Sequence, residues 1–184
     1  KALLIDTTNT NEQTLVLYNF VKDIIKAEVI KIIVGHFHSD CMGGRSILHE
    51  KGVESVAYSE TLQICKSQNL PIPQKPFVDA MAINFQGETV ICRYFGAGHT
   101  VDNSLVYFPA SQILFGGCLI KSMGSKELGN TKDAGIEDWD KTVLKVKTAY
   151  PSIKLVIPGH GAFGDLSLLD HTITLVKDYK EKKK

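Results

Sequence analysis

The apolar positions along the first third of the chain alternate between the spacing of strands and that of amphipathic helices. Short apolar, partly β-branched runs at residues 2–6, 29–34 and 54–58 predict three strands. Between the first two, apolar residues recur at helical spacing and predict a helix over residues 11–27, with its apolar face formed from Leu17 to Ile25. The pattern therefore begins as strand, helix, strand.

The next segments are bounded by glycine, serine and proline. A helix is expected from about Gly43 to Gly52, because glycine commonly follows the last helical residue. Another is expected over residues 60–67, with Ser59 as its N-cap. The stretch Asn69–Pro76 contains three prolines and predicts a loop.

The second half of the chain repeats this alternation. The predicted strands cover residues 78–85, 88–95, 104–108, 112–116 and 154–157. The predicted helices cover residues 136–150 and 165–183, the latter with Asp165 as its cap. Strands interleaved with helices indicate an α/β layer protein, and the consecutive strands between 78 and 116 indicate a mixed sheet.

Composition narrows the function classes. The chain has 184 residues, a net charge of +1, 43% hydrophobic and 22% charged residues, as expected for one globular domain. Its basic run, Lys180–Lys184, lacks interleaved aromatic residues and indicates a solvated helix end rather than a nucleic-acid contact. No apolar stretch approaches the roughly 20 residues that a membrane span needs. A polyanionic partner and a membrane span are therefore not expected.

Two further features concern processing and redox state. The chain opens directly on the apolar run Ala2–Ile5, so we expect that N-terminal strands, and any signal peptide before them, have been lost. Four cysteines in 184 residues are too sparse for a disulfide framework. We expect Cys65 and Cys92 to be buried thiols, while Cys41 and Cys118 lie beside acidic or glycine-rich loops.

The first candidate for chemistry follows the strand at 29–34. His36, His38 and Asp40 offer two imidazoles and a carboxylate, ligand types that zinc accepts, if the loop curls. Gly43 and Gly44 permit a tight turn into the next helix. A surface polar loop is the alternative, and an isolated His-x-His would favour it.

Three more segments end strands with a possible metal ligand. They are His99 in a glycine-rich loop, Cys118 after two glycines, and His160 between glycines. Taken singly, His99 fits a hairpin turn and Cys118 a buried structural thiol. Together, four strand ends carry ligand types suited to zinc, which is how an α/β sheet builds a site. His49 and His171 lie in helical patterns and are expected to be surface or partly packed residues.

The ordered motifs HFHSDCMGG, GAGHTVDN, GGCLIK, LGN and PGHG resemble the metallo-β-lactamase superfamily, and most of all the first subclass of class B β-lactamases. The resemblance covers nearly the whole chain. It implies an α/β fold, an αββα sandwich with mixed sheets, lacking some N-terminal strands. It also implies one metallo-β-lactamase-fold domain over residues 1–184.

Carried over by position, the resemblance assigns two Zn²⁺ ions and a substrate site. It implies that one zinc is bound by His36, His38 and His99, and the other by Asp40, Cys118 and His160. Lys121 would receive the substrate carboxylate, Asn130 would lie near the β-lactam carbonyl, and Asp6 would brace the metal loop. Without the resemblance, Lys121 and Asn130 fit a solvated lysine and a turn residue.

The implied activity is hydrolysis of the β-lactam amide bond of penicillins, cephalosporins and carbapenems by a zinc-bound hydroxide, which confers antibiotic resistance. In that reaction Asp40 would orient the nucleophile as well as bind metal, and Asn130 would stabilise the developing oxyanion. The implied partner is a small-molecule β-lactam, with no nucleic acid. The protein is expected to be a monomer in the periplasm or outside the cell.

Cys41 is a departure from the family pattern. It stands where relatives often carry arginine or serine, and the thiol could alter the surroundings of the second zinc ion or be oxidised. Thioesterases and many phosphodiesterases of the superfamily prefer histidine at that position, so its absence here argues against them. Another superfamily hydrolase acting on a thioester, lactone or phosphodiester remains one alternative. A zinc-binding protein without turnover is the other, although three ligands for each ion leave room for water and substrate.

Overall fold

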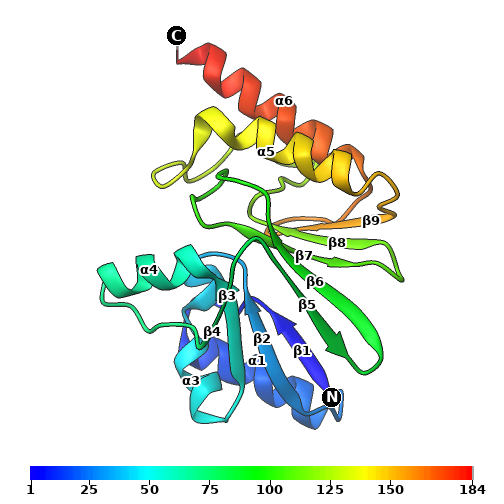
Figure 1. The fold of residues 1–184 in the computed structure, drawn as a ribbon. Coiled ribbons are helices and arrows are strands. Elements are labelled where there is room, and N and C mark those ends of the chain that lie inside the picture. Colours follow the sequence, from blue (N-terminus) through cyan, green and yellow to red (C-terminus); the bar gives the residue numbers. More distant parts are fainter. Residues whose placement is uncertain (184) are drawn as a thin grey trace. The chain divides into compact units, whose positions relative to one another are not determined.

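The computed structural model describes residues 1–183, and these residues form two compact units. The first comprises Lys1–Val78 and the second begins at Asp79. Each unit combines one sheet with helices (Figure 1). Each is described by itself below.

The sheet of the first unit is wholly parallel. Its strands lie in the order β1 (Ala2–Ile5), β2 (Val29–Val34), β3 (Glu54–Tyr58) and β4 (Lys75–Phe77), and every neighbouring pair is parallel. The central strand β2 is rich in β-branched residues and contributes to the core of this unit, as expected for a parallel sheet. The predicted loop over 69–76 was therefore wrong at its end, where β4 begins.

Four helices accompany this sheet within residues 1–78. They are α1 (Asn11–Asp23), α2 (Ser39–Met42), α3 (Arg45–Glu50) and α4 (Ser59–Ser67). The prediction over 11–27 was too long, because the chain leaves the helix after Asp23 and Lys26 adopts a φ of 58°. On the predicted apolar face Val21 is buried, whereas Ile24 and Ile25 are exposed.

The helix predicted from Gly43 to Gly52 is replaced by two short helices, α2 and α3. A Cβ on Gly44 would lie 1.7 Å from Thr14 Oγ1, so α1 packs too closely for any side chain at that position. Gly52 follows the helix with a φ of 78°, as predicted. Ser59 is the first residue of α4 and not its cap, a position held by Tyr58.

The sheet of the second unit is mixed, as predicted. Its strands lie in the order β5 (Ala80–Phe85), β6 (Glu88–Tyr94), β7 (Ser104–Phe108), β8 (Ile113–Gly117) and β9 (Leu155–Pro158). The pairs from β5 to β8 are antiparallel, and β8 pairs with β9 in parallel. This parallel pair brings the ends of β8 and β9, and the loops that follow them, to the same edge of the sheet.

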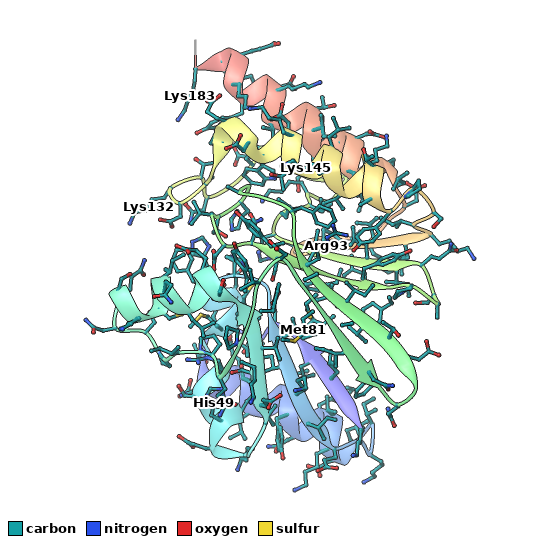
Figure 2. The ribbon with its side chains drawn as sticks, in the orientation of Figure 1. His49, Met81, Arg93, Lys132, Lys145 and Lys183 are labelled. Atoms are coloured by element: carbon teal, nitrogen blue, oxygen red, sulfur yellow. The ribbon has the colours of Figure 1, made fainter. Side chains whose placement is uncertain are left out.

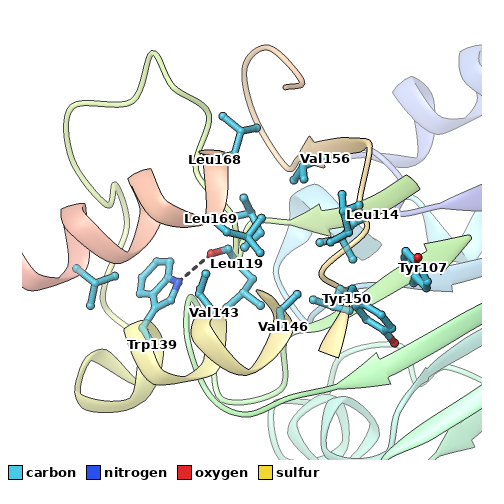
Figure 3. Close-up of a cluster of buried hydrophobic side chains, with 14 of the residues drawn as sticks. Tyr107, Leu114, Leu119, Trp139, Val143, Val146, Tyr150, Val156, Leu168 and Leu169 are labelled. Carbon is cyan, nitrogen blue, oxygen red and sulfur yellow. Dashed lines mark hydrogen bonds between the residues drawn. The ribbon is translucent and has the colours of Figure 1, made fainter. Parts of the chain in front are cut away.

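Helices α5 (Ile136–Ala149) and α6 (Ser167–Lys182) lie side by side in the second unit (Figure 1). Figure 3 shows their buried side chains, with Trp139, Val143 and Leu169 packed in the same cluster as Leu114 of β8. The N-cap of α6 is Leu166 and not the predicted Asp165, whose Oδ1 instead accepts a hydrogen bond from the Ser167 N–H at 2.9 Å, one residue before the cap.

Cysteines and histidines outside the candidate site follow their predictions. Cys65 in α4 and Cys92 in β6 are buried, and neither belongs to a disulfide within residues 1–183. His49 in α3 (Figure 2) is partly buried, with Nε2 lying 2.8 Å from Ser55 Oγ. No helix in this part of the chain has the length and apolar character that crossing a membrane requires.

Candidate metal centre

In the first unit, the end of β2 delivers three candidate ligands. His36 and His38 follow the strand directly, and Asp40 lies in the first turn of α2. The rings of the two histidines are 4.7 Å apart, and His36 Nε2 lies 3.7 Å from Asp40 Oδ1. One ligand atom each of His36, Asp40 and Cys41 falls within 4.8 Å of the others. Imidazole and carboxylate donors at such spacing suit zinc.

Asp6 holds this segment in place, as the resemblance implies. Its Oδ1 accepts a hydrogen bond from the Gly35 N–H at 2.6 Å. Desolvation by burial raises the pKa of the Asp6 carboxyl to about 7, while the Gly35 N–H and the Cys41 thiol lower it and the Asp40 carboxylate raises it. The sequence alone did not single out Thr7, whose N–H donates to the Cys41 carbonyl at 2.8 Å and whose Oγ1 accepts from the Gly44 N–H.

Cys41 contacts a candidate ligand directly. Its buried Sγ lies 3.0 Å from His36 Nδ1. A hydrogen bond to one ring nitrogen of a histidine orients the ring and determines which nitrogen is offered to a metal. The thiol therefore acts on His36, a ligand that the resemblance assigns to the first zinc, and not only on the surroundings of the second.

In the second unit, His99 lies in the loop between β6 and β7 and is buried. Asn103 organises this loop, because its Oδ1 accepts from the Thr100 N–H and its Nδ2 donates to the Gly96 carbonyl, both at 3.0 Å. The His99 ring packs edge-on against Trp139, with centroids 5.8 Å apart. Asn103 therefore bonds the backbone of this loop at two points.

Cys118 and His160 meet at the edge formed by β8 and β9. The Gly159 N–H donates to the Gly117 carbonyl at 2.7 Å. A Cβ on Gly159 would lie 2.5 Å from Cys118 Sγ, so only glycine permits this approach. Cys118 and His160 both line one cavity of about 240 Å³. The structure therefore brings a thiol and an imidazole to a common opening.

The same cavity contains the candidate substrate contacts. Lys121 and Lys126 line it together with Glu127 and Gly129. Asn130 is exposed and is not among the lining residues. Its Oδ1 accepts from the N–H of Lys132 (labelled in Figure 2) at 3.1 Å, as in a turn.

Trp139 connects several of these parts, although the sequence analysis did not select it. It is fully buried, and its Nε1–H donates to the Leu119 carbonyl at 2.8 Å (Figure 3). Its ring contacts His99 and lies 5.3 Å from Lys121 Nζ. The sequence could have indicated its importance, because it is the single tryptophan of the chain and lies within an amphipathic helix.

The donor set fits zinc chemistry in both units. His36, His38 and Asp40 come from the first unit, and His99, Cys118 and His160 from the second. Nitrogen, thiolate and carboxylate are the ligands that zinc takes, whereas magnesium and calcium prefer oxygen alone.

Comparisons with known proteins show the family. No family model matches the chain. The chain is 40% identical over 181 residues to a metallo-β-lactamase type 2 from Bacteroides fragilis, covering 98% of the chain and 73% of the relative. It is 37% identical over 175 residues to the type 2 enzyme of Bacillus cereus, covering 95% of the chain and 68% of that relative.

The fold of the chain is also similar to solved structures of metallo-β-lactamases. A metallo-β-lactamase from Pontibacter korlensis is 35% identical, with a TM-score of 0.93 over 96% of this chain and 82% of that one. The mono-zinc form of the metallo-β-lactamase FIM-1 from Pseudomonas aeruginosa is 29% identical, with a TM-score of 0.89 over 96% and 79%. The predicted fold class, mixed α/β with two sheets, is confirmed. The motifs, the fold and these relatives lead to one conclusion: the chain belongs to the metallo-β-lactamases.

Proposed function

We propose that this chain hydrolyses the amide bond of β-lactam antibiotics, including penicillins, cephalosporins and carbapenems, and thereby confers resistance. The relatives at 40% and 37% identity are both named metallo-β-lactamases. The observation that carries the proposal is the cavity of the second unit, where a thiol and an imidazole lie beside Lys121. A soft metal ligand next to a cation suits a substrate that carries both a scissile amide and a carboxylate.

We further propose that two zinc ions are bound, as the resemblance implies. His36, His38 and His99 would hold one, and Asp40, Cys118 and His160 the other. When bound, zinc lowers the pKa of a coordinated water to near 7 and polarises a carbonyl group. The structure of a relative in a mono-zinc form supports zinc as the metal.

The chain's own residues then orient and anchor the reactants. Asp40 would accept a hydrogen bond from the attacking water and hold it in line with the lactam carbonyl. The Lys121 ammonium would bind the substrate carboxylate. Because the N–H of Lys132 occupies Asn130 Oδ1, Asn130 would offer its Nδ2 as a donor to the developing oxyanion. His36 would be kept in position by Cys41.

The family membership also supports proposals about organisation and location. We propose that residues 1–184 form one metallo-β-lactamase domain, because the solved relatives match 96% of the chain. A monomer acting in the periplasm or outside the cell is proposed from the same resemblance. Fractionation of cells producing the full-length protein tests the location, and activity confined to the cytoplasm would contradict it.

The function is tested by hydrolysis of nitrocefin and a carbapenem, measured beside a thioester. We expect the lactams to be hydrolysed, the thioester to remain, and a chelator to abolish the activity. Cys118→Ser should lower kcat/KM for nitrocefin by about 100-fold or more, since a ligand to the metal is lost. Cys92→Ser is the matched control, because Cys92 is also a buried thiol and does not line the cavity.

Equal activity of Cys118→Ser and Cys92→Ser would contradict the role of Cys118. Turnover of the thioester without lactam hydrolysis would instead assign the chain to another activity of the superfamily. Zinc bound without turnover of any of these substrates would indicate a binding protein.

A further inference from the structure

The loop that lines the cavity is tied to helix α6 at three separate points. The Lys121 N–H donates to Thr172 Oγ1 at 2.8 Å. His171 Nε2 donates to the Ser125 carbonyl at 3.0 Å. These two bonds fix the beginning of the loop, which bears Lys121 itself.

A third bond holds the far end of the loop. Thr131 Oγ1 and the Tyr179 hydroxyl lie 3.1 Å apart. His171 and Tyr179 are eight positions apart, about two turns of the helix, so they project from the same side of α6. One helix therefore holds residues 121, 125 and 131 of a single loop.

The Thr172 hydroxyl makes one hydrogen bond within α6 and another to the loop. Its side chain is fully buried, and its Oγ1–H donates to the Leu168 carbonyl of the preceding turn at 2.7 Å. The hydroxyl hydrogen is thus committed to the helix, and the oxygen can only accept from the Lys121 N–H. If this acceptor were removed, the half-buried Lys121 N–H would lose its hydrogen bond to α6, which destabilises the loop.

Between the anchors, the loop has space on both sides. Lys126–Leu128 lines the candidate substrate cavity of about 240 Å³ on one side. The same three residues also line a second cavity of about 170 Å³, whose opposite wall includes Leu175 and Tyr179 of α6. Leu128 is buried in the core of this unit, whereas Lys126 and Glu127 are exposed, so the stretch before Leu128 depends on the bonds at Lys121 and Ser125 for its position.

We infer that helix α6 sets the position of the substrate-binding loop, with Thr172 and His171 as positioning residues that act through Lys121 and Ser125. Neither residue lines the cavity. Their effect is to hold the Lys121 ammonium where the carboxylate of a β-lactam arrives. The inference rests on the proposed function for its kinetic consequence, but its structural content does not.

The test compares Thr172→Val with Thr174→Val. Both residues lie in α6 and both donate to the carbonyl four residues earlier, Thr172 to Leu168 and Thr174 to Asp170. Thr174 is exposed and has no bond to the loop within residues 1–183. The control variant therefore removes the same intrahelical bond and leaves the loop anchor intact.

In Thr172→Val we expect faster hydrogen exchange at the Lys121 amide and across residues 121–129, measured without substrate. KM for a carboxylate-bearing β-lactam should rise by roughly three- to ten-fold, because one hydrogen bond that positions Lys121 is lost. We expect kcat and the zinc content to remain nearly unchanged. Thr172→Ser should restore both values. Thr174→Val should match the wild type.

His171 supplies a second variant in case Thr172→Val folds poorly. His171→Leu removes the donor to Ser125, and His171→Gln keeps a side-chain N–H. Exchange and KM should change in the first and recover in the second. Exchange rates equal to those of Thr174→Val in both Thr172→Val and His171→Leu would overturn the inference. A wild type that hydrolyses no β-lactam would refute the proposed function while leaving the exchange result decisive for the loop.

Discussion

At the scale of single residues, the candidate metal ligands could be predicted from the sequence, whereas the burial of a nearby arginine could not. The candidate ligands were predictable because each follows a strand and stands beside glycine or another ligand type. The buried environment of Arg45 could not be predicted from the sequence. This side chain is fully buried, and its three guanidinium nitrogens donate no hydrogen bond within residues 1–183. Burial lowers the pKa of its guanidinium, an effect that depends on packing between α3 and its neighbours and leaves no mark in the local sequence.

His49, beside Arg45, gives a prediction for stability against pH. Burial, and then the nearby Arg45 charge, lower its pKa below 6.5 in the folded protein. Above pH 6.5 His49 is neutral in both states. As the pH falls from 6.5 through the lower folded-state pKa, the unfolded chain binds the proton first and stability is lost.

Urea unfolding at pH 7.5 and pH 5 checks this, by comparing wild type with His49→Gln. The glutamine keeps a polar partner for Ser55 but does not titrate. We expect the variant to lose less stability on acidification. The same loss in both proteins would show that His49 does not contribute.

At the scale of elements, the apolar pattern predicted most strands and helices, and it failed where packing overrides local preference. Strand β3 was predicted at its observed bounds, Glu54–Tyr58, because a β-branched and aromatic run is bounded by turns. The helix expected from Gly43 was not continuous, since Gly44 is packed against Thr14 of α1. That contact lies 30 positions away in sequence, so a local window cannot detect it.

Helix α5 contributes a buried hydrogen bond, from Trp139, that its apolar pattern does not predict. Trp139→Phe removes the Nε1–H donor and leaves the buried Leu119 carbonyl without its partner. We expect the free energy of unfolding to fall by about 2 kcal/mol, from the lost hydrogen bond and the vacated volume.

Leu144→Ala, at an exposed position of the same helix, is the control and should change stability by less than about 0.5 kcal/mol. Both values come from chemical denaturation of the metal-loaded protein. Equal values for the two variants would show that the indole does not hold the Leu119 turn.

At the scale of the whole molecule, the chain consists of two units, and each contains three of the six candidate ligands. A mixed sheet was predicted for the second unit from the consecutive strands between 78 and 116, but the order of its strands was not. The parallel pairing of β8 with β9 could not be predicted from a local pattern, because it joins segments about 40 residues apart through an intervening helix. The family resemblance supplied the grouping of the six ligands, which periodicity could not.

Asp40, from the first unit, and Cys118, from the second, are proposed to bind the same ion. We expect Asp40→Asn and Cys118→Ser each to lose one zinc ion per chain, and the double variant to lose that same ion and no more. If the residues served separate ions, the losses would add. Elemental analysis after dialysis measures the zinc content, and additive losses would refute the shared site.

The attachment of the substrate-binding loop to α6 also affects how this enzyme can evolve. Two of the three anchor points in the loop are backbone atoms, the Lys121 N–H and the Ser125 carbonyl. Exchanging a side chain between residues 122 and 129 deletes neither atom, and only proline at position 121 would remove the N–H. Selection by a new antibiotic can therefore exchange the exposed side chains Lys126 and Glu127 while both backbone anchors persist.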